Sequence, residues 1–105
     1  MARKIIWTET AWSDLEEIAS YITRDSVHYA AAFVLETREA AKTLATFSKR
    51  GHVVPEMNDP HIRELFVRSY RLIYQVVESE VHILGLIHGA MDLKSAWDKK
   101  ERFRG

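Results

Sequence analysis

Four residues in the second half of the chain have side chains of the types that can cleave RNA without a metal ion. Glu56 can act as a base, and His88 can donate a proton near neutral pH. Arg63 and Arg71 can clamp a phosphate, because the planar guanidinium fork matches its oxygens. Cleavage through attack by the RNA's own 2′-hydroxyl is expected only if all these groups converge around one phosphate.

Each of these residues also has a simpler structural explanation. Either arginine could form an ion pair inside the chain, with Glu56, Glu64 or Glu78 as the acid. Glu56 could be a solvated loop carboxylate, and His88 could hydrogen-bond only a neighbouring carbonyl group. The sequence leaves both the catalytic and the structural explanation open for each residue.

The two arginines are expected on neighbouring strands of one hairpin. Alternating apolar residues predict strands at Ile62–Val67, Tyr70–Val77 and Val81–His88, and short polar connections make them an antiparallel meander. Because Arg63 and Arg71 lie close to either side of the first turn, we expect both guanidinium groups to project from one open face of the sheet.

Aromatic residues extend the candidate contact surface. Tyr70 and Tyr74 alternate along one strand and could stack on a base, although such tyrosines are more often core residues. Trp97 lies in a mixed basic tail that is either packed on the sheet or available to a target. Tyr74 and Trp97 therefore join the two arginines as candidate residues for binding a target or partner.

The first half of the chain predicts the support for this hairpin. Lys4–Trp7 reads as a short strand, and apolar residues recur every three or four positions from Ala11 to Ile22 and again from Ala30 to Phe47. These periods predict a helical hairpin. Turn-forming residues in Ser48–His61 predict one long loop.

Two local expectations concern the first helix. The polar cluster Thr8-Glu9-Thr10 is suited to capping its start. Acidic residues are interpreted as a solvated helix face; they are Asp14, Glu16, Glu17 and Asp25.

Composition limits the classes of function. The chain has 105 residues, which suits one domain, and its 15 lysines and arginines balance its 15 aspartates and glutamates. Cysteine is absent and the five histidines have no i, i+4 pair, so neither a metal site nor a cofactor is predicted. No long apolar segment suggests a membrane span, and we expect a cytoplasmic protein.

Several segments, in their order and spacing, resemble the RelE/ParE superfamily of toxins from type II toxin–antitoxin modules, a group that includes plasmid stabilisation proteins. The resemblance reaches from the N-terminus to about Leu93, which suggests a toxin domain at residues 1–93 and a tail at 94–105. The segments are W-T-E-T-A-W-S-D-L-E-E-I-A-S-Y-I, G-H-V-V-P-E, I-R-E-L, Y-R-L-I-Y and V-H-I-L-G-L-I-H-G.

The resemblance implies an α+β fold with a short N-terminal strand, a helical hairpin and a three-stranded antiparallel meander. It also implies a growth-arresting toxin that is neutralised by a cognate antitoxin. ParE-like members inhibit DNA gyrase, whereas RelE-like members cleave mRNA in the ribosomal A site. In some RelE-like members the positions similar to Glu56, Arg63, Arg71 and His88 carry the cleavage, and these positions are also common in ParE-like members.

Two departures favour the gyrase hypothesis over the endoribonuclease hypothesis. Only Lys49 and Arg50 precede Gly51, and Gly89-Ala90-Met91 follows His88 where an active nuclease is expected to carry an arginine or an aromatic residue. The formal net charge of zero also gives no surplus of cations for binding ribosomal RNA. An inactive homologue with a regulatory role is a third hypothesis, and a homodimer is a further expectation.

Overall fold

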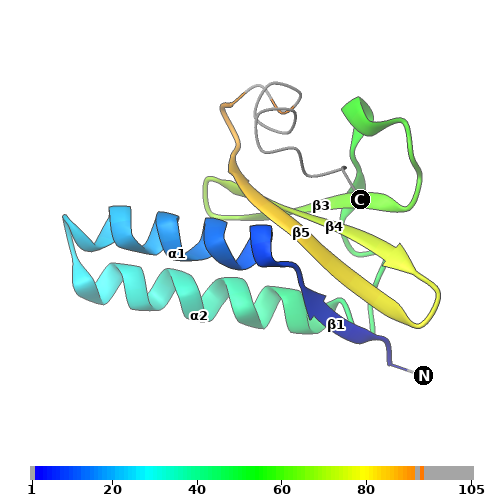
Figure 1. Cartoon of the computed structure of the whole chain (residues 1–105), viewed down its shortest axis with the longest axis horizontal. Helices are drawn as coiled ribbons and strands as arrows, with labels where there is room; N and C mark the ends of the chain where they lie inside the picture. The colour runs from blue at the N-terminus through cyan, green and yellow to red at the C-terminus, as the bar shows by residue number, and fades with distance from the viewer. Residues whose placement is uncertain (1, 92, 94–105) are drawn as a thin grey trace.

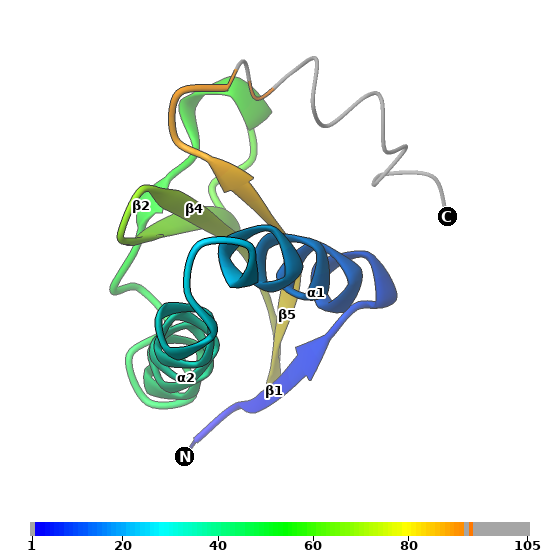
Figure 2. The ribbon, with the colours of Figure 1, turned by 90° about the vertical axis from the view of Figure 1, so that its left-hand side faces the viewer.

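Two helices pack on one face of a five-stranded sheet in the computed structural model, which describes residues 2–91 and 93 (Figure 1). Viewed from the side, the helices lie next to each other and cover the sheet (Figure 2). The elements are β1 (Lys4–Trp7), α1 (Glu9–Thr23), α2 (Val27–Thr43), β2 (His52–Val53), the 3-10 helix η1 (Pro55–Met57), β3 (Ile62–Val67), β4 (Tyr70–Val77) and β5 (Glu80–His88).

The strand order is β1-β5-β4-β3-β2, with β1 parallel to β5 and the other pairs antiparallel. The predicted meander is therefore confirmed, and β5 begins at Glu80, one residue earlier than expected. The single long loop predicted at Ser48–His61 is wrong in part, because it contains β2 and η1. A strand of two residues, His52 and Val53, is too short to produce a periodic pattern.

Side-chain caps fix the start of both helices. The Thr8 hydroxyl accepts a hydrogen bond from the amide of Ala11 at 3.1 Å, as the sequence predicts for this cluster, and Ser26 caps α2 in the same way. The Thr8 hydroxyl also donates to the carbonyl of Ile83 at 2.9 Å. One residue therefore both starts α1 and ties it to β5.

The second helix ends earlier than its apolar pattern suggests. Helix α2 stops at Thr43, and the chain turns so that Phe47, expected on the buried stripe, is 64% exposed. Leu44, just beyond the helix, is fully buried and keeps the end of α2 in the core.

The main core lies between the helices and the sheet. It includes Leu15 of α1, Phe33 of α2, and Leu72, Tyr74 and Ile83 of the sheet. A smaller core lies on the opposite face, where η1 and its flanks cover part of the sheet. Its buried members are Val54, Ile62, Ile73, Ile87 and Leu93.

Asp14 departs from the expected solvated face. It is only 4% exposed, and its Oδ2 accepts a hydrogen bond from the amide of Leu86 at 3.0 Å. Strand β1 pairs with β5 only as far as Ile83, so the edge of β5 beyond this point needs another partner. The carboxylate of Asp14 supplies it.

Candidate functional site

Arg63 and Arg71 lie on opposite faces of the sheet, so the prediction of one shared face is wrong. In the β3–β4 register, Arg63 stands opposite Tyr74 and Arg71 stands opposite Phe66. Residues opposite each other share a face and neighbours along a strand alternate, so Arg63 shares the face of Tyr74 and Arg71 the face of Ile73. Tyr74 belongs to the main core and Ile73 to the smaller one.

Arg71 is buried in a closed cluster of charges. Its side chain is 9% exposed, and its Nε donates to Oε1 of Glu64. Its Nη1 and Nη2 donate to the two carboxylate oxygens of Glu56 at 3.4 and 3.3 Å. Strand β3 supplies Glu64 on the same face, and η1 brings Glu56 over it. The ion-pair explanation is therefore confirmed for Arg71.

Burial and the two carboxylates act on the pKa of Arg71 in opposite directions. Burial lowers the pKa, because it disfavours the charged form, while the hydrogen bonds and charges of Glu64 and Glu56 raise it. The net effect raises the pKa above its ordinary value. Arg71 is therefore a permanent cation whose charge is directed toward two acids of its own chain.

Arg63 has a different structural role. Its Nη1 donates to the carbonyl oxygen of Gly51 at 2.8 Å and, at 3.5 Å, to that of Lys49. Within residues 2–91 and 93, no carboxylate forms an ion pair with Arg63. The guanidinium thus holds the segment that leads from α2 into β2.

Tyr74, a candidate residue for binding a target or partner, lies in the main core. The side chain is fully buried, and its hydroxyl donates to the carbonyl of Ser48 at 2.8 Å and accepts from the amide of Gly51 at 2.9 Å. Burial raises the pKa of the phenol above its ordinary value. The alternative interpretation of Tyr74 as a core residue is confirmed. Trp97 lies outside the described residues, and its role stays a prediction.

His88 lies at the end of β5, one residue beyond Ile87, the cross-strand neighbour of Arg71, and it shares with Tyr70 the face opposite Arg71. Its ring meets Tyr70 edge to face at 5.2 Å between centroids, and its Nδ1 accepts from the amide of Ala90 at 3.1 Å. His88 pairs with Tyr70 and Arg63 pairs with Tyr74, so four residues of strand, about 13 Å, separate them along the sheet. In the part of the chain that the structure describes, the predicted catalytic set does not converge.

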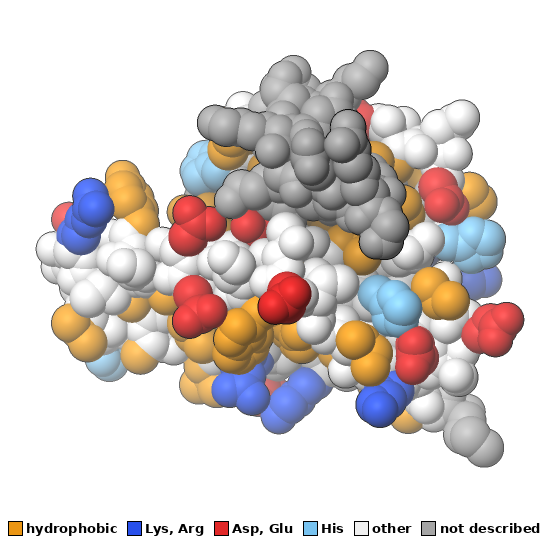
Figure 3. Space-filling view, viewed as in Figure 1, with side chains coloured by type: hydrophobic (Ala, Val, Ile, Leu, Met, Phe, Trp, Pro, Cys, Tyr) orange, Lys and Arg blue, Asp and Glu red, His pale blue; other side chains and the backbone are white. Residues whose placement is uncertain are grey.

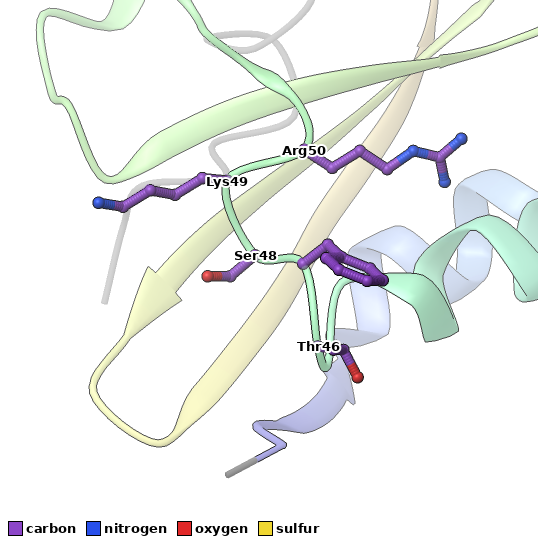
Figure 4. Close-up of a pocket in the computed structure, with 5 residues that line it drawn as sticks. Thr46, Ser48, Lys49 and Arg50 are labelled. Carbon is purple, nitrogen blue, oxygen red and sulfur yellow. The ribbon is translucent and has the colours of Figure 1, made fainter.

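The α2–β2 segment forms a shallow hollow of about 490 Å³, shown in Figure 4. Lys49 and Arg50, the two cations that precede Gly51, point in opposite directions there (Figure 4). Arg50 donates to the hydroxyl of Thr43 at 2.8 Å. The two cations therefore do not act as a joint clamp on one anion.

The described residues hold no cluster of three or more histidine or acidic side chains that is arranged to bind a metal ion. None of the helices in residues 2–91 is both long and apolar enough to span a bilayer.

A profile of the family described as the ParE toxin of the type II toxin–antitoxin system, parDE, matches residues 5–93. The chain belongs to the ParE toxin family. Toxin RelE2 of Caulobacter vibrioides is 33% identical over 88 residues, which make up 83% of this chain and 96% of that toxin. The prediction of a RelE/ParE superfamily toxin is thereby confirmed.

Two solved structures share the fold of this ParE-family chain. The chromosomal ParDE toxin–antitoxin system from P. aeruginosa superposes with a TM-score of 0.69 at 23% identity, over 83% of this chain and 96% of that one. The toxin–antitoxin complex RelBE2 from Mycobacterium tuberculosis gives 0.54 at 20% identity, over 84% and 99%. The predicted α+β toxin fold is confirmed.

Proposed function

We propose that this ParE-family protein arrests growth by binding and inhibiting DNA gyrase, and that a cognate antitoxin neutralises it. One observation carries the choice of target: Arg63 and Arg71 lie on opposite faces, with Arg71 closed by two acids. Metal-free RNA cleavage needs several groups around one phosphate, whereas inhibition by binding needs only a complementary surface.

The helical hairpin offers such a surface. Apolar, acidic and basic side chains are interspersed over it in the view of Figure 3. Exposed apolar side chains on the two helices suit a protein partner, because apolar surface is stabilised when another protein covers it. Those on the hairpin are Trp12, Tyr21, Val27, Tyr29 and Leu35. The two solved neighbours come from a ParDE and a RelBE2 toxin–antitoxin system, which supports an antitoxin as one partner.

Supercoiling by purified DNA gyrase tests the target. Adding the purified protein should reduce supercoiling of relaxed plasmid, and adding the antitoxin encoded beside it should restore the activity. Full supercoiling at toxin concentrations well above that of the enzyme would exclude gyrase as the target.

A RelE-like, ribosome-dependent mRNA endoribonuclease is the second candidate, because the curated relative at 33% identity bears the name Toxin RelE2. Cleavage of ribosome-bound mRNA that is abolished in His88→Ala would support it. His88 is exposed, so this variant should fold normally.

Induced expression in a bacterium compares the candidates directly. A stop in DNA replication before translation supports gyrase, and the reverse order supports the endoribonuclease. Growth that continues with soluble, folded protein would leave the inactive homologue as the explanation.

A further inference from the structure

The guanidinium fork of Arg71 is already filled in the way a phosphate would fill it. A phosphate or carboxylate binds an arginine best through two parallel hydrogen bonds to its terminal nitrogens. Nη1 and Nη2 of Arg71 each meet a different oxygen of Glu56, at 3.4 and 3.3 Å. The carboxylate of Glu56 therefore occupies the position that an incoming anion would take.

The second acid closes the remaining approach. Glu64 accepts from the Nε of Arg71, and its own side chain is 10% exposed. One guanidinium thus faces two carboxylates, which leaves the cluster with one negative charge. An anion that reaches this part of the sheet meets repulsion in place of a free cation.

The fold holds Glu56 at the fork. Its helical turn, η1, begins after Val54, which is fully buried in the smaller core. Met57 packs against the same core, and Asn58 ends the turn in the left-handed region with a φ of 52°. Apolar anchors on both sides of Glu56 therefore direct its carboxylate toward Arg71.

We infer that Glu56 is a specificity-determining residue whose carboxylate excludes phosphate groups from Arg71 and so keeps nucleic acid off this face of the sheet. This role of Glu56 rests on the proposed function. It gives a physical reason why a fold that resembles those of toxins named RelE would bind a protein and not a nucleic acid. Glu64 positions the guanidinium, and Glu56 blocks its open side.

Glu56→Gln tests the inference through binding of a short fluorescein-labelled oligouridylate, measured by fluorescence anisotropy at low ionic strength. Wild type should bind weakly. The variant should bind at least about tenfold more tightly, because the guanidinium of Arg71 can then form charge-assisted hydrogen bonds with a phosphate group. Glu16→Gln is the matched control. It makes the same change of charge at an exposed position of α1, on another part of the molecule from Arg71, and it should bind as wild type does.

The triple variant Glu56→Gln, Glu64→Gln, Arg71→Gln removes the whole cluster without leaving a buried charge unpaired, and it should lose the gain. Equal gains in Glu56→Gln and Glu16→Gln, or no gain in a folded Glu56→Gln or Glu56→Ala, would overturn the inference. Circular dichroism establishes the folding of each variant. The supercoiling assay tests the proposed gyrase target independently of this comparison, so failure of the target and failure of the inference are distinct. Tight binding of RNA by wild type would overturn both.

Discussion

The carboxylate of Asp14 accepts a hydrogen bond from the backbone amide of Leu86, and this contact at 3.0 Å joins α1 to β5 across most of the chain. Both groups are buried. The amide stands where β1 no longer pairs with β5, so the side chain completes the edge of the sheet.

Replacing Asp14 with alanine should lower the free energy of unfolding by about 1–3 kcal/mol, because a buried amide loses its acceptor. Urea unfolding followed by circular dichroism measures the change. Glu16→Ala, at an exposed position of the same helix, is the control and should stay within about 0.5 kcal/mol of wild type. Equal stability of the two variants would show that the Asp14 contact is dispensable.

Replacing Tyr74 with phenylalanine should lower the free energy of unfolding by about 1–3 kcal/mol. The change keeps the ring but leaves the amide of Gly51 and the carbonyl of Ser48 without their buried partner. Tyr21→Phe, at a side chain that is 63% exposed, should have almost no effect. A Tyr74→Phe variant as stable as wild type would mean that other groups form hydrogen bonds with the amide of Gly51 and the carbonyl of Ser48.

Acid should weaken the contact between α2 and the β3–β4 turn. The hydrogen bond with Arg68 holds the pKa of Glu36 below its ordinary value of 4.5. A carboxyl group with a depressed pKa stabilises the fold above its unfolded pKa, and this contribution disappears as the pH falls through the folded pKa. The stability difference between wild type and Glu36→Gln should therefore shrink below about pH 4.5.

Unfolding curves of wild type and Glu36→Gln at several pH values measure this effect. Glu36 is solvent-exposed, so added salt should also reduce the difference. A stability difference that stays constant with pH would show that the charge of Glu36 does not stabilise the fold through its ion pair with Arg68.

The β3–β4 register could have been deduced from the sequence. The predicted bounds of both strands match the structure, and the connection of Arg68 and Ser69 places Val67 opposite Tyr70. Counting outward from that pair sets Arg63 opposite Tyr74, on the face away from Arg71. The prediction of one shared face fails although both strands are correct, because the alternation of side chains along a strand, and not the spacing of two residues in the sequence, sets the face on which each lies.

Other features depend on contacts that no local pattern contains. Glu56 reaches Arg71 because η1 folds over the smaller core, and the sequence of a turn does not show which strand it will cover. Asp14 is buried because β1 ends early beside β5. In both cases tertiary structure decides the environment of a charge that looks solvated in the sequence.

The parallel pairing of β1 with β5 constrains when the sheet can close during synthesis. Residues Lys4–Trp7 are synthesised well before their partners, Glu80–Ile83. The sheet therefore closes only after most of the polypeptide has been synthesised, since contacts so distant in sequence form late. Residues Lys4–Trp7 therefore stay without their strand partner during synthesis until Glu80–Ile83 have been made, and a product truncated before Glu80 lacks the strand that β1 needs.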